Sequence, residues 1–196
     1  MKRIAFFDFD GTITTKDTLL ENIKFHKGSL QFYVGFLLNS PYLVAFKAKV
    51  ISNQTAKEKV LKFFFGGSDE ISFQKKCDDF ATAKLPEMIR PKAVTEIKKH
   101  LEQGTEVVIV SASASNWFRK WANEHNLKMI STTLEVHNNK VTGKITGKNC
   151  YGEEKVALIN QRYNLKEYDE IYCYGDTSGD KPMLALGTKT FYKPFR

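Results

Sequence analysis

The chain has 196 residues, of which 42% are hydrophobic and 27% charged; this composition is typical of a globular domain with a real core and argues against disorder. A formal net charge of +8 favours anionic partners such as phosphorylated metabolites, lipid headgroups or nucleic acid. The three widely spaced cysteines fit neither a disulfide framework nor a zinc site, and they favour a reducing, cytoplasmic location.

The first predicted element is a buried strand in RIAFFDFD, residues 3–10, which ends in two acidic residues, Asp8 and Asp10. Carboxylates at this spacing repel each other, and folding alone gives no reason to place them there. The pair is either an acidic turn or part of a cation site. Oxygen ligands suit a hard cation such as Mg²⁺, to which Asp10 could offer its carboxylate or its backbone carbonyl.

Residues 15–86 have a helical pattern throughout, with breaks predicted at Pro41 and at the Gly66–Gly67 pair. This segment is too long for a simple connection between strands. We therefore expect a helical cap at residues 15–86, inserted into an α/β core made of residues 1–14 and 87–196.

The most hydrophobic stretch of the cap, residues 32–46, is interrupted at Asn39, Ser40 and Pro41. It falls short of the roughly 20 apolar residues that cross a bilayer, so no transmembrane segment is expected. Two interpretations stay open. The stretch is either the packing core of the cap or an apolar surface for a lipid tail or membrane, rimmed by Lys47 and Lys49.

The rest of the chain alternates between helical and strand patterns. Helices are predicted in residues 91–104, 116–126 and 153–164, strands in residues 106–113 and 170–175, a hairpin around Asn138–Asn139, and a short edge strand within residues 188–195. This alternation predicts a doubly wound, Rossmann-like parallel sheet.

Polar residues follow three of the predicted strands, and ligands of such sheets bind at the carboxyl ends of strands. The clusters are Asp8 with Asp10, Ser111 with Ser113, and Asp176 with Asp180. Alone, each could be an acidic turn or a helix cap, and Lys155 could be a solvated lysine on a helix. Together they predict one site built from distant parts of the chain.

In order along the chain, Asp8-Phe-Asp10-Gly11-Thr12, Ser111, Lys155 and Gly175-Asp176-Thr-Ser-Gly-Asp180 resemble the four motifs of haloacid dehalogenase (HAD) superfamily phosphatases. The resemblance covers essentially the whole chain, including the position of the cap. It is to subfamily IB, the branch with phosphoserine phosphatase, histidinol-phosphate phosphatase and a phosphatidylglycerophosphate phosphatase.

The resemblance implies a Mg²⁺-dependent phosphomonoester hydrolase that forms an aspartyl-phosphate. Asp8 would be the nucleophile and Asp10 the general acid and base. The metal would be held by the Asp8 carboxylate, the backbone carbonyl of Asp10 and the Asp176 carboxylate. Phosphate would be bound by a further set, namely Gly11, Thr12, Ser111, Ala112 and Lys155. Asp180 would hold a metal-bound water or orient Lys155.

The substrate is expected to be a small phosphorylated metabolite or a phospholipid headgroup. Asp17 lies near the position at which phosphoserine phosphatases carry an acidic residue that recognises their substrate. Those enzymes also use a cap arginine, and residues 15–86 contain no arginine, which argues against phosphoserine. Ser113 and Cys150 are further candidate substrate contacts.

Three alternatives stay open: a phosphatidylglycerophosphate phosphatase at the membrane surface, a phosphate-binding protein without turnover, and phosphoryl transfer to an acceptor other than water. No aromatic-basic stripe predicts a nucleic-acid partner, peripheral membrane contact is left open, and the sequence does not fix the oligomeric state.

Overall fold

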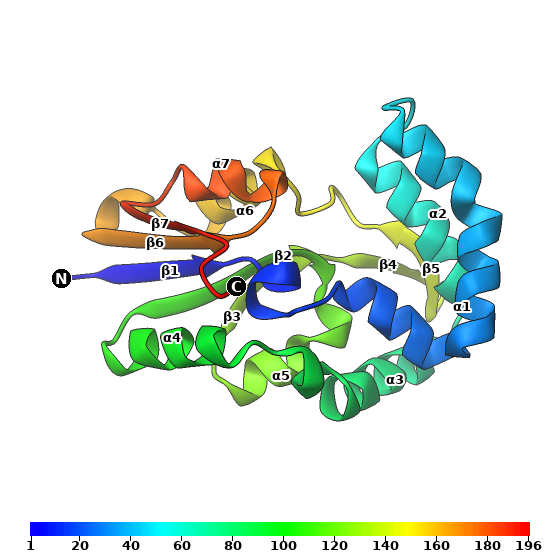
Figure 1. The fold of residues 1–196 in the computed structure, drawn as a ribbon, viewed down its shortest axis with the longest axis horizontal. Helices are drawn as coiled ribbons and strands as arrows, with labels where there is room; N and C mark the ends of the chain where they lie inside the picture. The colour runs from blue at the N-terminus through cyan, green and yellow to red at the C-terminus, as the bar shows by residue number, and fades with distance from the viewer.

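A parallel five-stranded sheet forms the centre of the computed structural model, which describes all 196 residues (Figure 1). Its strand order is β3-β2-β1-β6-β7, and every neighbouring pair is parallel. The strands are β1 (Arg3–Phe7), β2 (Glu106–Ala114), β3 (Lys128–Thr132), β6 (Glu170–Gly175) and β7 (Lys189–Tyr192). The predicted α/β class with a parallel sheet is confirmed.

Helices cover both faces of the sheet. Successive side chains of β1 point to opposite faces, and they belong to two separate hydrophobic clusters that the helices complete. Ala5 and Phe7 belong to the cluster that contains residues of α4 (Pro91–Glu102) and α5 (Arg119–Glu124). Ile4 and Phe6 belong to the cluster with residues of α6 (Glu153–Arg162) and α7 (Lys181–Leu184). Short 3₁₀ turns complete the core at Leu85–Met88, Ser115–Trp117, Leu165–Glu167 and Ser178–Asp180.

The cap consists of α1 (Thr18–Lys47), α2 (Asn53–Phe65) and α3 (Glu70–Ala83), between β1 and β2 (Figure 1). The predicted break at Pro41 is wrong, because α1 continues through it. Pro41 cannot donate to the carbonyl of Leu37, but the hydroxyl of Ser40 donates to that oxygen at 2.7 Å instead. The helical dihedral angles are interrupted at Gly28, with φ 77° and ψ 167°. None of the helices combines the length and hydropathy needed to span a bilayer.

The predicted hairpin is formed by β4 (Leu134–His137) and β5 (Lys140–Ile145), which are antiparallel. Asn138 and Asn139 both have positive φ, as a two-residue turn of this kind requires. The hairpin packs on the cap: the amide of Gly67 donates to the carbonyl of Val141 at 2.8 Å. A β-carbon on Gly143 would lie 2.3 Å from Cα of Lys62 in α2, so glycine permits this close approach.

Candidate active site

The tight turn after β1 brings the first acidic motif to the edge of the sheet. Asp8 is held against β6, since its amide donates to the carbonyl of Tyr174 at 2.9 Å. The chain then reverses over Phe9–Ile13, where Gly11 has φ +83°. The hydroxyl of Thr12 lies between two acidic side chains, 3.0 Å from Oδ2 of Asp8 and 3.3 Å from Oδ1 of Asp176.

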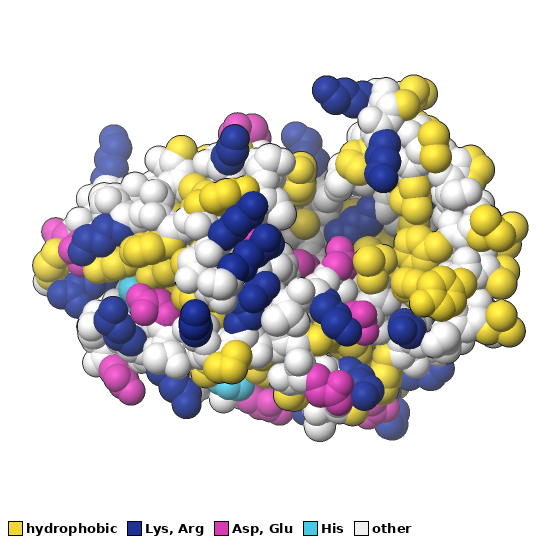
Figure 2. Space-filling model, viewed as in Figure 1, with side chains coloured by type: hydrophobic (Ala, Val, Ile, Leu, Met, Phe, Trp, Pro, Cys, Tyr) yellow, Lys and Arg dark blue, Asp and Glu magenta, His cyan; other side chains and the backbone are white.

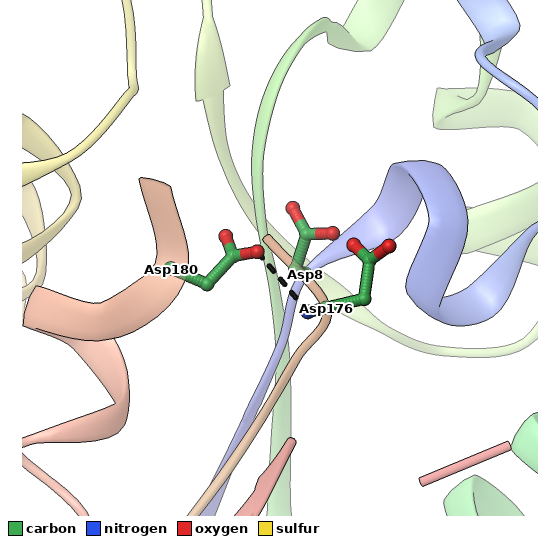
Figure 3. A group of neighbouring side chains, drawn as sticks. All are labelled: Asp8, Asp176 and Asp180. Atoms are coloured by element: carbon green, nitrogen blue, oxygen red, sulfur yellow. Dashed lines mark hydrogen bonds between the residues drawn. The ribbon is translucent and has the colours of Figure 1, made fainter. Parts of the chain in front are cut away.

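Three carboxylates meet at the carboxyl ends of β1 and β6 (Figure 3). One oxygen from each of Asp8, Asp176 and Asp180 lies within 4.8 Å of the others, and all three side chains are buried. Oδ2 of Asp180 accepts hydrogen bonds from the amide of Asp176 at 3.2 Å and from the amide of Thr177 at 2.9 Å. The first of these bonds is drawn in Figure 3. This oxygen therefore fixes the turn that places Asp176.

Lys155 is the cation inside this cluster. It lies in the first turn of α6 and is only 1% exposed, so it is not a solvated helix lysine. Its Nζ donates to Oδ1 of Asp8 and Oδ1 of Asp180, each at 2.7 Å, and to the carbonyl of Val110 at 2.8 Å. Burial acts to lower the pKa of Lys155, but the two carboxylates outweigh it and raise that pKa. Asp180 thus orients Lys155 with one oxygen while its other oxygen holds the turn.

The electrostatics of the cluster fit a divalent cation. Burial raises the pKa of Asp8 to about 7 against the opposing charge of Lys155, and burial and the charge of Asp180 raise the pKa of Asp176. Three carboxylates face the single ammonium of Lys155, although the guanidinium of Arg196 also pairs with Asp176 from the rim. The three carboxylates offer only oxygen atoms to a cation, and oxygen is the donor type that Mg²⁺ prefers.

The carboxylate of Asp10 is not part of that cluster and faces the cap. Its Oδ1 accepts from the amide and the hydroxyl of Thr18, each at 2.7 Å, and its Oδ2 accepts from the hydroxyl of Ser113 at 2.5 Å. The indole of Trp117 donates to the hydroxyl of Thr18 at 3.0 Å and fixes it in turn. The structure therefore separates the Asp10 carboxylate from the three clustered carboxylates, and a metal contact through its backbone carbonyl stays a prediction.

Of the predicted phosphate-binding residues, Thr12 and Lys155 contact the clustered carboxylates, while Ser111 does not line the cavity described below. Ser111 is fully buried, and its Oγ accepts from the amide of Ser113 at 3.0 Å. Ala112 lines the cavity described below. The amide of Gly11 donates to the hydroxyl of Thr14 at 3.2 Å, so in this structure it is already engaged.

A cavity of about 340 Å³ lies between the core and the cap. Its polar part comes from both domains and consists of Asp8, Asp10, Asp17, Asn53, Lys57, Ser113, Asn149, Lys155, Thr177 and Asp180. Asp17, one of the expected substrate contacts, caps α1 by accepting from the amide of Leu20 at 3.1 Å. Burial and the charge of Asp10 raise the pKa of Asp17 to about 6.

Cys150, by contrast, does not line the cavity and is a poor candidate for substrate contact. It is fully buried in the cluster under α6 and α7, where its thiol faces the carbonyl of Ile130 at 4.0 Å. Burial raises the pKa of this thiol to about 11. Its neighbours Asn149 and Tyr151 line the cavity instead.

Lys57 of α2 is a cavity residue that sequence reasoning missed. Its Nζ crosses from the cap to the core, donating to the carbonyl of Ala112 at 2.6 Å and to Oδ1 of Asn149 at 3.3 Å. Burial lowers the pKa of Lys57 in spite of the charges of Asp10 and Asp17. In the sequence, nothing distinguishes it from the solvated lysines of the same helix.

Gly11 offers a test of whether the carboxylate cluster binds Mg²⁺. A β-carbon at this position would lie 2.5 Å from Oδ2 of Asp176. We expect Gly11→Ala to lose about 1 kcal/mol or more of stability through its positive φ. The clash should also weaken Mg²⁺ binding by about tenfold or more, as measured by calorimetric titration.

Gly104→Ala is the matched control for this substitution. Gly104 also has a positive φ, +71°, but a β-carbon there meets nothing within 4 Å. It should share the loss of thermal stability and keep the Mg²⁺ affinity of the wild type. Equal Mg²⁺ affinities in the two variants would contradict the role of Asp176 as a metal ligand.

Comparisons with known proteins identify the family of this chain. The family described as haloacid dehalogenase-like hydrolase matches residues 5–185. Protein CicA of Caulobacter vibrioides is 30% identical over 197 residues, which cover 98% of this chain and 86% of that protein.

Among solved structures, a protein of unknown function from Bordetella pertussis Tohama I has a TM-score of 0.84 at 22% identity, covering 97% of this chain and 89% of that one. A phospho-aspartyl intermediate analogue of phosphoserine phosphatase has a TM-score of 0.69 at 16% identity, covering 96% and 85% of the two chains. These likenesses at low identity show the fold. The match over residues 5–185 shows that the chain belongs to the haloacid dehalogenase-like hydrolase family.

Proposed function

We propose that this protein is a Mg²⁺-dependent phosphomonoester hydrolase that works through an aspartyl-phosphate on Asp8. One observation carries the proposal. Asp8 lies among two other buried carboxylates with the ammonium of Lys155 at 2.7 Å, while the carboxylate of Asp10 faces the same cavity from the cap side. A nucleophile, a fixed cation and a separate acid are what this hydrolysis needs.

The roles follow from these positions. Mg²⁺, when held by Asp8, Asp176 and the backbone carbonyl of Asp10, would screen the repulsion between the carboxylate and the phosphate dianion. Lys155 would hold the phosphoryl oxygens and keep Asp8 ionised. Ser111 and the backbone at Gly11, Thr12 and Ala112 would supply further donors to these oxygens once substrate is bound.

Asp10 would move the protons. In the first step an oxygen of Asp8 bonds to phosphorus, the ester P–O bond breaks, and Asp10 gives its proton to the leaving alkoxide. In the second step Asp10 takes a proton from water, water attacks phosphorus, and the bond to Asp8 breaks to release phosphate. The bonds from Thr18 and Ser113 hold the Asp10 carboxylate in position for both transfers.

A phosphate-binding protein without turnover is the alternative from another class. Phosphate binding without turnover does not need a general acid. The Asp10 carboxylate, which is held beside the proposed phosphate site, therefore favours an enzyme. The substrate would be a small phosphorylated metabolite or a lipid phosphate, and the expected location remains cytoplasmic.

Phosphate release tests the proposal directly. Purified protein would be incubated with p-nitrophenyl phosphate and a panel of soluble and lipid phosphomonoesters, with and without Mg²⁺. We expect release that EDTA stops and added Mg²⁺ restores. No release from any ester in the presence of Mg²⁺ would refute the proposal, and product formed only with an alcohol acceptor would indicate phosphoryl transfer.

A further inference from the structure

The outer face of α1 is apolar and exposed. Apolar side chains recur along it at three- and four-residue spacing, namely Leu30, Tyr33, Val34, Leu37, Leu38 and Val44. Leu30 and Leu37, two turns apart, are 78% and 72% exposed. The opposite side of the same helix is occupied, since Phe32, Phe36 and Leu43 pack on the main hydrophobic cluster. We call the exposed side the α1 outer face; Figure 2 shows hydrophobic side chains gathered over this part of the molecule.

Two residues of α1 are both partly exposed and part of the cavity lining. Leu20 and Phe46 are each 37% exposed, and both also line the cavity. The apolar lining also includes Phe36 and Leu43 of α1 and Ala56 and Val60 of α2. The same cavity also contains Asp8 and Lys155, so its lining is part apolar and part charged.

The charged residues that flank the α1 outer face in the sequence are all lysines. No acidic residue occurs between Glu21 and Glu58, and no charged residue of either sign occurs in residues 28–46. Lysines lie on both sides of that uncharged stretch, at positions 24, 27, 47 and 49. An apolar helical face with basic flanks is complementary to an anionic lipid surface. Two copies of this chain would instead bring like charges together.

We propose that the α1 outer face docks on an anionic lipid bilayer and that the cavity accepts a phosphomonoester carried on an apolar chain. The second part rests on the proposed function. The phosphate would lie at Asp8 and Lys155, and the chain would follow the apolar lining past Phe46 to the lipid. The membrane contact is the first part and stands on the exposed face and its lysines alone.

Sedimentation with vesicles tests the docking. Vesicles of phosphatidylcholine alone would be compared with vesicles that contain about one fifth phosphatidic acid. We expect the wild type to pellet with the anionic vesicles and to be released at high salt. The double variant Leu30→Glu, Leu37→Glu should lose at least about tenfold in partitioning, because two leucines no longer enter the lipid. Lys47→Gln with Lys49→Gln should weaken binding to anionic vesicles as well.

The matched control is Ile71→Glu, which changes an 80% exposed apolar residue on α3 and should pellet like the wild type. Circular dichroism checks that each variant is folded. The docking proposal is overturned if the wild type stays in the supernatant, if Leu30→Glu, Leu37→Glu pellets unchanged, or if sedimentation velocity shows a dimer that this variant dissociates.

Two substrates separate the parts of the proposal. Turnover of phosphatidic acid in vesicles would be divided by turnover of p-nitrophenyl phosphate, and this ratio should fall at least about tenfold in Leu30→Glu, Leu37→Glu. Hydrolysis of p-nitrophenyl phosphate but not of phosphatidic acid overturns the apolar substrate class and leaves the phosphatase. Hydrolysis of neither also overturns the apolar substrate class, while the phosphatase is judged by the full panel of esters and the docking by the vesicle sedimentation.

Discussion

The Asp8→Asn variant is expected to retain less than about one-thousandth of the wild-type kcat/KM for p-nitrophenyl phosphate in the presence of Mg²⁺. An amide is a poor nucleophile, so no acyl phosphate forms. The same substitution removes one of the three clustered carboxylates, which are the proposed metal site, and one acceptor of Lys155. The kcat/KM and the Mg²⁺ affinity of the variant should therefore both be lower than those of the wild type.

Acid quenching during turnover makes this prediction specific. Wild-type protein should carry a hydroxylamine-sensitive phosphate on Asp8, and the variant should carry none. Asp79→Asn is a matched control, since Asp79 is an exposed residue of α3 that pairs only with Lys75 at the surface. It should keep both the activity and the trapped phosphate. Activity of Asp8→Asn above one-tenth of the wild type, or phosphate trapped on another residue, would contradict the assignment.

The convergence of the candidate site residues could be predicted because it depends on topology. Once the runs before Asp8 and Asp176 are interpreted as parallel strands, their carboxyl ends must meet at one edge of the sheet. Lys155 reaches the same place because it begins the helix that precedes β6. No side-chain detail was needed for this part of the prediction.

The errors in the prediction arise where tertiary contacts override local patterns. Pro41 lies within α1 because the Ser40 hydroxyl satisfies the carbonyl that proline leaves free. The edge strand β3 was not predicted, since its five residues, Lys-Met-Ile-Ser-Thr, include only two strongly apolar side chains. Lys57 could not be recognised because its partner, the carbonyl of Ala112, is brought near only when the cap packs on the core.

The second large effect is expected for Lys155→Met. Methionine fills a similar volume but leaves the carboxylates of Asp8 and Asp180 and the carbonyl of Val110 without their shared donor. Removing one partner of a buried ion pair costs about 3–5 kcal/mol, because an uncompensated charge stays buried. Urea unfolding of the metal-free protein should show a loss of this size. Lys148→Met, at a lysine whose side chain is 78% exposed, should change stability by less than about 0.5 kcal/mol.

Combining this change with Asp180→Asn separates the charge from the packing. If repulsion between Asp8 and Asp180 causes the instability, the double variant should be more stable than Lys155→Met alone. Mg²⁺ should also raise the melting temperature of Lys155→Met by more than that of the wild type, since the ion would supply the missing positive charge. Activity should not return in either case, because the phosphoryl oxygens have still lost the ammonium that binds them. A double variant no more stable than Lys155→Met would instead assign the loss to the unsatisfied carbonyl of Val110, and Lys155 would then act on the fold through the backbone of β2.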